Sequence, residues 1–343
     1  MMAQRVCLIP GDGVGKEVIP AAAEILAALG LGLEFVEAPA GFEFFSRCGD
    51  AIPPRTLADV EACGVALFGA TSSPSTPAEG YRSPILVLRK TFDLYANLRP
   101  VSSFTGPFSR ANIDLLIVRE NTEGLYSGRE RQEGDTAIAE RWISRRGSQR
   151  IARMAFEQAR RRVARRKASD PANGHALVTI VHKANVLKVT DGLFRQTARE
   201  VAANYPDIAC SELLVDAMAM RLVRDPERFD VILTTNLFGD ILSDEASALV
   251  GGLGVTPSAN LGERIAVFEP VHGSAPDIAG RGVANPAGAI LSAAMLLEHI
   301  GEADAADRVQ AAVARTLAEG VLTPDLGGKS GTDELTRAVL RNL

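Results

Sequence analysis

The chain has 343 residues, of which 46% are hydrophobic and 23% are charged, and its formal net charge is −5. This length predicts two domains, and the composition excludes a disordered chain. The acidic balance argues against a protein whose main task is to coat nucleic acid or an anionic membrane.

Short apolar runs that are typical of strands alternate along the chain with longer amphipathic segments that are typical of helices. Strands are predicted at 5–9, 33–37, 65–68, 113–118, 177–181, 212–215, 231–234 and 265–268. Helices are predicted at 17–29, 84–91, 149–167, 192–204, 239–250, 286–300 and 303–319. This alternation predicts an α/β fold with a largely parallel sheet. The Gly- and Pro-rich stretches 71–83 and 251–262 are predicted loops or hinges.

The cysteines and the apolar stretches bear on the cellular compartment. The cysteines, which show no CxxC spacing, are Cys7, Cys48, Cys63 and Cys210. We therefore expect neither a disulfide framework nor a zinc site, and we expect the protein to be in a reducing compartment. No signal-peptide pattern and no apolar stretch long enough to span a bilayer is evident. We therefore expect a cytoplasmic protein that does not bind membranes.

The predicted helix 149–167 is rich in arginine, with a basic run from 160 to 167. One interpretation is a nucleic-acid patch. The other is a solvated helix face, which is favoured because Ile151, Met154, Ala155 and Ala159 form an apolar stripe at helical spacing.

Four predicted strands deliver charged or amide side chains at their carboxyl ends, where open α/β sheets bind ligands. The residues concerned are Arg119, Glu120 and Asn121, then His182, Lys183 and Asn185, then Asp216, and finally Asn236, Asp240 and Asp244. Four such strand ends favour a functional site over ordinary turns.

Asp240 and Asp244 are four residues apart on a predicted helix, so both carboxylates share one face. Together with Asp216 they would supply three hard oxygen ligands, which suit Mg²⁺ or Mn²⁺. The alternative is a pair of acids that stabilises a helix N-terminus.

Arg89, Arg99 and Arg119 each border an apolar element. Three fixed guanidinium groups suggest a di- or tricarboxylate substrate, because the planar fork matches carboxylate geometry. The alternative is three unrelated surface ion pairs.

Two glycine-containing segments are candidate cofactor sites. The run GDGVG at 11–15 follows the first strand, but Lys16 stands at the sixth position of the dinucleotide pattern GxGxxG, so the match fails and a flexible turn is expected. The run HGSAPDI at 272–278 is a compact loop with one acid, which could accept the ribose hydroxyls of an adenosine, although it could also be only a turn.

Taken together, these segments resemble the β-decarboxylating dehydrogenase family, which includes isocitrate, isopropylmalate and homoisocitrate dehydrogenases. The resemblance covers essentially the whole chain. The motifs that carry it include GDGVGKEV (11–18), LRKTFDLYANLRP (88–100), VRENTEGLYSG (118–128), HKANV (182–186), NLFGDILSDEA (236–246) and FEPVHGSAPDIAG (268–280).

The resemblance implies a two-domain isopropylmalate-dehydrogenase-like fold with parallel and mixed sheets, distinct from the classical Rossmann domain. Residues 1–98 and 251–343 would form a discontinuous NAD-binding domain. Residues 99–250 would form the dimerisation and metal/substrate domain, with an arm near 125–143. It also implies homodimers with shared active sites, and leaves pairing of dimers into tetramers open.

The resemblance further implies residue roles. Arg89, Arg99 and Arg119 would clamp the malate part of the substrate. Asp240 and Asp244, with Asp216 of the partner subunit, would hold Mg²⁺ or Mn²⁺. Tyr126 and the partner subunit's Lys183 would be the catalytic acid–base pair, and Asn185 would point toward the nicotinamide or the distal group of the substrate. The adenosine of NAD would be held by His272, Gly273, Ser274, Ala275, Asp277, Ile278 and Asn285.

The segment before Arg89 bears on the substrate. Isopropylmalate enzymes usually place an apolar pair at Ile85 and Leu86, which this chain has, whereas EGYRSPI at 79–85 resembles members that act on homoisocitrate. Some bacterial members of that group carry an arginine where this chain has Leu86. We therefore expect NAD-dependent conversion of homoisocitrate to 2-oxoadipate, with Arg82 or Ser83 reaching the distal carboxylate. The alternatives are isopropylmalate, isocitrate as a side or main substrate, or a non-enzymatic anion- or RNA-binding protein that uses the basic run.

Overall fold

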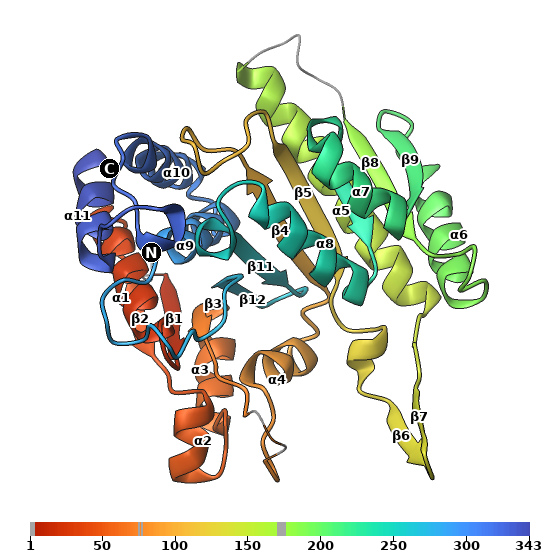
Figure 1. Cartoon of the computed structure of the whole chain (residues 1–343), viewed down its shortest axis with the longest axis horizontal. Coiled ribbons are helices and arrows are strands. Elements are labelled where there is room, and N and C mark those ends of the chain that lie inside the picture. The colour runs from red at the N-terminus through yellow and green to blue at the C-terminus, as the bar shows by residue number, and fades with distance from the viewer. Residues whose placement is uncertain (1–3, 75, 77, 170–175) are drawn as a thin grey trace. The chain divides into compact units, whose positions relative to one another are not determined.

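The chain folds into two compact units. The computed structural model describes residues 4–74, 76, 78–169 and 176–343. Unit 1 comprises Met1–Leu94, Ser103–Ala111 and Ser247–Leu343, and unit 2 comprises Tyr95–Ser102 and Asn112–Ala246 (Figure 1). The sequence predicts crossings after 98 and after 250, whereas the chain leaves unit 1 after Leu94, returns to it for Ser103–Ala111, and finally leaves unit 2 after Ala246.

Unit 1 contains a mixed sheet in the strand order β2-β1-β3-β12-β11. Its strands are β1 (Arg5–Gly11), β2 (Glu34–Glu37), β3 (Val65–Ala70), β11 (Pro257–Leu261) and β12 (Ala266–Pro270). All pairs are parallel except the antiparallel pair β11–β12. Its helices are α1 (Gly15–Ala28), α2 (Phe42–Cys48), α3 (Pro54–Cys63), α4 (Pro84–Thr91), α9 (Ala287–His299), α10 (Ala303–Ala318) and α11 (Thr332–Asn342).

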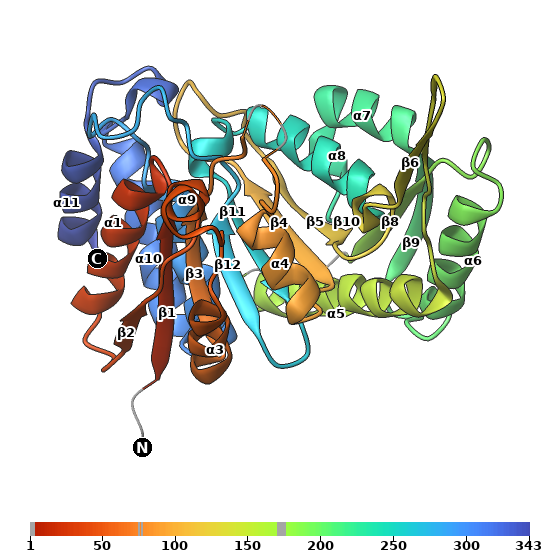
Figure 2. The same ribbon diagram turned by 90° about the horizontal axis from the view of Figure 1, so that it is seen from below.

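Apolar strands place the core of unit 1 on both faces of this sheet. Every residue of β3 is buried, as expected for a parallel strand covered on both sides. Helices α1 and α9 pack on the sheet with α10 and α11 outside them, and α3 packs against β1 and β3 on the opposite face (Figure 2). Cys7, Ile9, Val60 and Phe68 belong to the apolar cluster on the α3 side.

Unit 2 has a sheet in the strand order β4-β5-β10-β8-β9. Its strands are β4 (Ala96–Ser102), β5 (Asp114–Glu120), β8 (Leu177–His182), β9 (Ala209–Leu214) and β10 (Val231–Thr234). All pairs are parallel except the antiparallel pair β4–β5. Its helices are α5 (Arg145–Ser169), α6 (Thr190–Ala202), α7 (Val215–Arg224) and α8 (Asn236–Ala248), the last of which ends in unit 1.

A separate antiparallel hairpin in unit 2 pairs β6 (Glu130–Glu133) with β7 (Thr136–Ala139). It projects as two thin strands within the segment 125–143, for which an arm is predicted (Figure 1). The predicted α/β class with parallel and mixed sheets is confirmed.

Several elements differ from the sequence predictions for identifiable reasons. The stretch 251–262 is predicted as loop, yet Pro257–Leu261 forms β11, because pairing with β12 compensates for weak strand formers such as Pro257 and Asn260. The strand predicted at 212–215 ends at Leu214, and Val215 begins α7. Helix α1 begins at Gly15 rather than at 17, so Pro20 lies in its second turn.

The turn between β1 and α1, residues 11–15, for which a flexible turn is predicted, lies close to the backbone of Ala70 and Ser274. Gly11 and Gly13 have φ of +76° and +55°, which favour glycine. A Cβ on Gly11 would lie 2.1 Å from the carbonyl oxygen of Ala70, and one on Gly13 would lie 2.0 Å from that of Ser274. The glycines therefore allow close backbone approach.

Among the described residues, the helices are too short or too polar for any of them to cross a bilayer. The basic helix α5 is tied to acidic neighbours. Arg160 pairs with Asp207, while Arg162 and Arg166 both reach Asp230 and Asp114. These contacts favour the interpretation of α5 as a helix face paired within the chain.

Candidate functional site

Arg119, near the end of β5, is a fully buried cation held by two neighbours from one helix. Its Nε and Nη2 donate to Oδ1 of Asn236 at 3.1 and 2.7 Å, and its Nη1 donates to Oδ1 of Asp240 at 2.5 Å. Both partners lie on α8. A buried guanidinium requires such compensation because it has left water. The geometry therefore fixes the guanidinium plane of Arg119 against α8.

Arg99, on the neighbouring strand β4, is buried and reaches the same helix. Its Nε donates to Oδ1 of Asn97 at 2.8 Å, and its Nη1 donates to the hydroxyl of Ser243 at 2.6 Å. It also pairs with Asp240 and Asp244, each at 3.2 Å. Two cations from adjacent strands thus meet two carboxylates from one helix.

Tyr126 completes this cluster. Its hydroxyl donates to Oδ2 of Asp240 at 2.6 Å, and the guanidinium carbon of Arg119 lies 5.1 Å from its ring centroid. Burial raises the pKa of Tyr126, and the hydrogen bond to Asp240 adds to the effect. The side chain is still 40% exposed, so the phenol is a proton donor that can be reached from solvent at neutral pH.

Asp240 and Asp244 lie one turn apart on α8, as the spacing predicts. Burial and the neighbouring Asp240 raise the pKa of Asp244, against the lowering effect of Arg99. Within the part of the chain that the structure describes, no three His, Cys, Asp or Glu side chains are grouped closely enough to hold a metal. Asp240 and Asp244 are two hard oxygen donors on one helix, and their chemistry fits Mg²⁺ or Mn²⁺.

The predicted third ligand, Asp216, lies apart from that pair and contacts Lys183 instead. Asp216 is in the first turn of α7, and its carboxylate accepts a hydrogen bond from Nζ of Lys183, which lowers the pKa of Asp216. Lys183 directly follows β8. Its backbone N–H donates to Oδ2 of the fully buried Asp191 at 2.7 Å, and Asp191 pairs with Arg141 at 2.8 Å. Asn185 follows on the exposed side of the same loop.

Arg89 lies on α4 in unit 1, whereas Arg99 and Arg119 belong to unit 2. It is buried, and it donates to Asn260 and to Glu269, each at 3.0 Å. At the start of the same helix, Arg82 is exposed, and Ser83 stands at the N-cap position without a side-chain capping bond. Among the described residues, the side chains of Arg82 and Ser83 have no hydrogen-bond partner.

The loop 272–278 in unit 1 carries a buried acceptor without a partner. His272 Nδ1 donates to the carbonyl oxygen of Gly273 at 3.0 Å, and burial lowers the pKa of His272, so the ring is neutral. Its Nε2 is buried and has no hydrogen-bond partner among the described residues. A buried acceptor of this kind fits a donor on a ligand, such as the amino group of an adenine.

The rest of this loop also fits an adenosine. Asp277 is exposed, and its carboxylate has no partner within the described chain. Ala275, at φ 39°, bends the backbone into a compact turn, and Ile278 closes that turn by donating to the carbonyl of Ala275 at 3.1 Å. Asn285 is fixed by its own bonds to Asp325, at 3.1 Å, and to the N–H of Ala287, at 3.0 Å.

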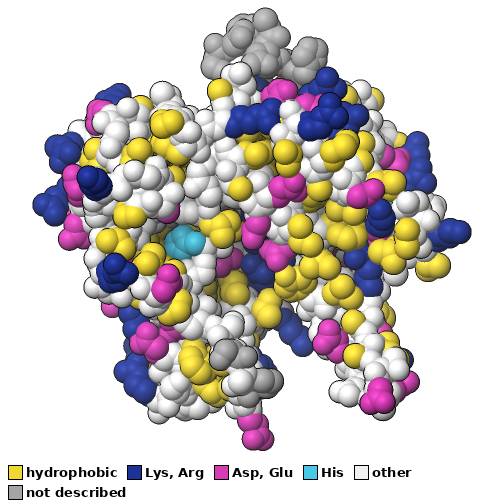
Figure 3. All heavy atoms as spheres, in the orientation of Figure 1, with side chains coloured by type: hydrophobic (Ala, Val, Ile, Leu, Met, Phe, Trp, Pro, Cys, Tyr) yellow, Lys and Arg dark blue, Asp and Glu magenta, His cyan; other side chains and the backbone are white. Residues whose placement is uncertain are grey.

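Exposed apolar side chains gather over α7, α8 and the loop before α6 in unit 2 (Figure 3). They are Val186, Val189, Met220, Val223 and Ile241, each more than half exposed. Such a concentration of apolar surface marks an interaction site more often than free surface.

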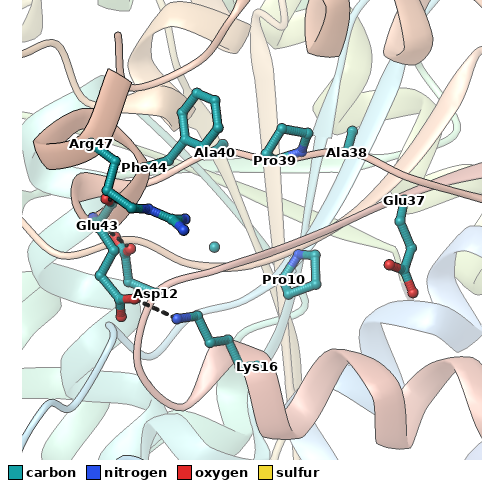
Figure 4. Close-up of a pocket in the computed structure, with 11 residues that line it drawn as sticks. Pro10, Asp12, Lys16, Glu37, Ala38, Pro39, Ala40, Glu43, Phe44 and Arg47 are labelled. Atoms are coloured by element: carbon teal, nitrogen blue, oxygen red, sulfur yellow. Dashed lines mark hydrogen bonds and ion pairs between the residues drawn. The ribbon is translucent and has the colours of Figure 1, made fainter. Parts of the chain in front are cut away.

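A pocket of about 370 Å³ opens in unit 1 at the carboxyl ends of β1 and β2 (Figure 4). None of the side chains predicted to bind substrate, cofactor or metal lines it. Its Lys16 forms an ion pair with Glu43.

The sequence predictions did not identify the residues that orient the charged side chains of the site. Asn97 and Ser243 orient Arg99, and Asp191 with Arg141 orients Lys183. Asn97 could have been found, because it lies two residues from Arg99 on one strand and therefore on the same face. Asp191 and Arg141 are far apart in sequence, and no local pattern connects them.

The chain is similar over almost its whole length to one family of known proteins. The family model described as isocitrate/isopropylmalate dehydrogenase matches residues 5–339. An isocitrate/homoisocitrate dehydrogenase of Thermus thermophilus is 54% identical over 100% of this chain and 99% of its own length. A homoisocitrate dehydrogenase of Methanocaldococcus jannaschii is 50% identical over 98% of this chain and 96% of its own length. The crystal structure of isocitrate dehydrogenase from Methylococcus capsulatus superposes with a TM-score of 0.91 at 43% identity, covering 99% of both chains.

Gly239 tests the fixed position of Arg119. Replacing a helical glycine by alanine ordinarily stabilises a protein by about 0.5–1 kcal/mol. At Gly239 the new Cβ would lie 2.6 Å from Cγ of Arg119, whose guanidinium is held at its far end. We expect Gly239→Ala to lower the free energy of unfolding by about 1–2 kcal/mol, as measured by urea denaturation. Gly192→Ala in α6, where nothing lies within 4 Å, is the matched control and should be neutral or stabilising. A stabilised Gly239→Ala would contradict the fixed guanidinium.

Proposed function

Because the chain belongs to the isocitrate/isopropylmalate dehydrogenase family of oxidative decarboxylating dehydrogenases, we propose that it converts homoisocitrate to 2-oxoadipate and CO₂ with NAD, a step of the α-aminoadipate route to lysine. The observation that carries the proposal is the cluster around Asp240, where one carboxylate meets Arg99, Arg119 and Tyr126. It combines carboxylate recognition, a cation ligand and a proton donor in one place.

The arginines would bind the substrate's carboxylates. Arg99 and Arg119 are pre-oriented by Asn97, Ser243 and Asn236, so little side-chain entropy is lost when an anion arrives. Arg89, fixed by Asn260 and Glu269, would be the third member of the clamp. A planar guanidinium can donate two parallel hydrogen bonds to a carboxylate, which favours di- and tricarboxylates over neutral substrates.

Two side chains would move protons. The partner subunit's Lys183 would accept the proton of the 2-hydroxyl group, and NAD, when bound, would supply the hydride acceptor for this oxidation. When CO₂ leaves, its bonding electrons remain on C3, and Tyr126 would donate a proton there. Hydrogen bonding to Asp240 supports this role, because it holds the phenol in its protonated form and fixes its direction.

A divalent cation, Mg²⁺ or Mn²⁺, would be held by Asp240, Asp244 and the partner subunit's Asp216. When bound, it would polarise the substrate's C2 oxygen and stabilise negative charge there. Arg99 and Arg119 balance the charge of Asp240.

NAD would occupy the loop 272–278 together with Asn285. Asp277 would accept hydrogen bonds from the ribose hydroxyls, and its charge would repel the 2′-phosphate of NADP. The unpartnered Nε2 of His272 would accept from the adenine. Gly273, Ser274, Ala275 and Ile278 would supply backbone and apolar contacts.

The start of α4 favours homoisocitrate over isopropylmalate. To bind an isopropyl group, Ile85 and Leu86 would have to form one continuous apolar surface. Ile85 instead packs against the core of unit 1, while Leu86 is 43% exposed, so the two side chains face different surroundings. Arg82 and Ser83 lie just ahead of them, and their polar side chains suit a distal carboxylate.

A homodimer with shared active sites would complete the site. Lys183 and Asp216 lie together, apart from Asp240 and Asp244, and three of the exposed apolar side chains, Met220, Val223 and Ile241, flank these groups on α7 and α8. A second copy would cover this surface and bring its own Lys183 and Asp216 to the Asp240 cluster.

Substrate choice is tested by measuring NADH formation with homoisocitrate, isopropylmalate and isocitrate side by side. We expect the highest kcat/KM with homoisocitrate. Replacing both Arg82 and Ser83 by alanine should lower that value about tenfold or more, through loss of hydrogen bonds to a charged group. Unchanged homoisocitrate kinetics in the double variant would refute the role of these residues. A higher kcat/KM with isopropylmalate in the unmodified protein would establish the alternative.

Cofactor choice is tested by the ratio of kcat/KM for NAD to that for NADP. We expect NAD to be preferred because Asp277 repels a 2′-phosphate. Asp277→Asn removes the charge while keeping the side-chain size. It should lower the ratio of kcat/KM for NAD to that for NADP, because it weakens the binding of NAD and relieves the repulsion of NADP. A preference for NADP in the unmodified protein would contradict the proposal.

The shared site is tested by complementation between two inactive variants, Lys183→Met and Asp240→Asn. In a mixed dimer, one site would combine the intact Asp240 of one chain with the intact Lys183 of the other. Refolding an equimolar mixture should therefore restore about a quarter of the original activity, since half of the dimers are mixed and each has one intact site. The variants refolded separately are the control. No recovery in a mixture shown to contain mixed dimers would mean that each chain builds its own site.

A further inference from the structure

The turn between β1 and α1 lies against the proposed cofactor loop. The N–H of Val14 donates to the carbonyl oxygen of Ser274 at 2.9 Å, and a Cβ on Gly13 would approach that same oxygen to 2.0 Å. The glycine therefore allows the turn to contact the loop's backbone directly. This contact fixes the first part of the loop.

Glu17, in the first turn of α1, fixes the other end of the loop. Its Oε1 accepts from the N–H of Gly280 at 2.7 Å, and its Oε2 accepts from the N–H of Gly282 at 3.0 Å. Both glycines have positive φ, 75° and 64°. A single carboxylate thus satisfies two backbone donors of a turn that only glycine adopts easily. Asp277 lies between the two fixed ends with its side chain exposed.

A third contact links the loop to the segment that precedes α4. The hydroxyl of Ser72 donates to that of Ser274 at 2.9 Å, and the N–H of Ser72 donates to Oδ2 of the buried Asp12 at 2.8 Å. Asp12 also accepts from the N–H groups of Phe42 and Glu43, at 2.6 and 3.0 Å. The support behind the loop is therefore anchored in the body of unit 1.

We propose that Glu17 is a positioning residue for the cofactor: it holds residues 272–282 in the conformation that binds the adenosine of NAD. The inference rests on the proposed function, which assigns NAD to this loop. A loop held in its binding conformation loses less conformational freedom when the ligand arrives, so the effect of Glu17 is on affinity. The hydrogen bonds that Glu17 accepts come from Gly280 and Gly282 of this loop, so kcat is expected to change little.

The test is Glu17→Gln, studied by fluorescence titration with NADH alone and by steady-state kinetics. Glutamine keeps the size but has a single acceptor oxygen, so one of the two glycine N–H groups loses its partner. We expect the Kd for NADH and the KM for NAD to rise about tenfold, which corresponds to the loss of one hydrogen bond to a charged group. We expect kcat and the KM for the hydroxy acid to stay within about twofold. Glu24→Gln, on the exposed side of the same helix, makes the same charge change and should leave all four quantities unchanged.

Asp277→Ala separates failure of this inference from failure of the proposed function. If Asp277→Ala weakens NADH binding and Glu17→Gln does not, the supporting role of Glu17 is overturned while the cofactor loop stands. If neither variant weakens NADH binding, the assignment of NAD to the loop fails, and the role of Glu17 fails with it. If Glu17→Gln raises the KM for the hydroxy acid as much as that for NAD, the residue acts by general loosening, which also overturns the proposal.

Discussion

The carboxylate of Asp240 compensates two buried cations, and much of unit 2 follows from that constraint. An uncompensated buried charge costs several kcal/mol. Asp244 offsets part of this cost for Arg99, and Asp240 offsets it for both Arg99 and Arg119. The two oxygens of Asp240 are shared among two guanidinium groups and the hydroxyl of Tyr126. The position of α8 beside β4 and β5, and the absence of a side chain at Gly239, both serve this arrangement.

The proposed binding regions of the two units are held in place by different means. In unit 2, the side chains proposed to bind carboxylates have directions fixed by amides and hydroxyls such as Asn97 and Ser243. In unit 1, the proposed cofactor loop takes its shape from backbone contacts made behind it, by the turn at residues 11–15 and by Glu17. The turn at residues 11–15 is rich in glycine although it does not match the dinucleotide pattern GxGxxG. Its glycines allow close approach to the protein's own backbone.

Strong local patterns made parts of the fold predictable from the sequence. Helix α4 has the predicted bounds, because Pro84 starts it and an apolar stripe continues it, and the spacing of Asp240 and Asp244 predicts their common face. Strands β4 and β11 escaped prediction because Pro100, Pro257 and Asn260 are poor strand formers whose place is set by neighbouring strands. The support of Lys183 by Asp191 and Arg141 depends on tertiary packing. Local sequence periodicity does not predict such contacts.

The exposed position of Asp277 on a loop supported from behind has an evolutionary consequence. If NAD binds there as proposed, side chains that discriminate between dinucleotides could be exchanged without rebuilding the main chain, because the conformation is maintained by residues that do not touch the discriminating group. A lineage with this architecture would then alter its coenzyme preference through a few surface substitutions while the scaffold stays constant. The same separation gives protein engineers a place to redesign selectivity at low risk to folding.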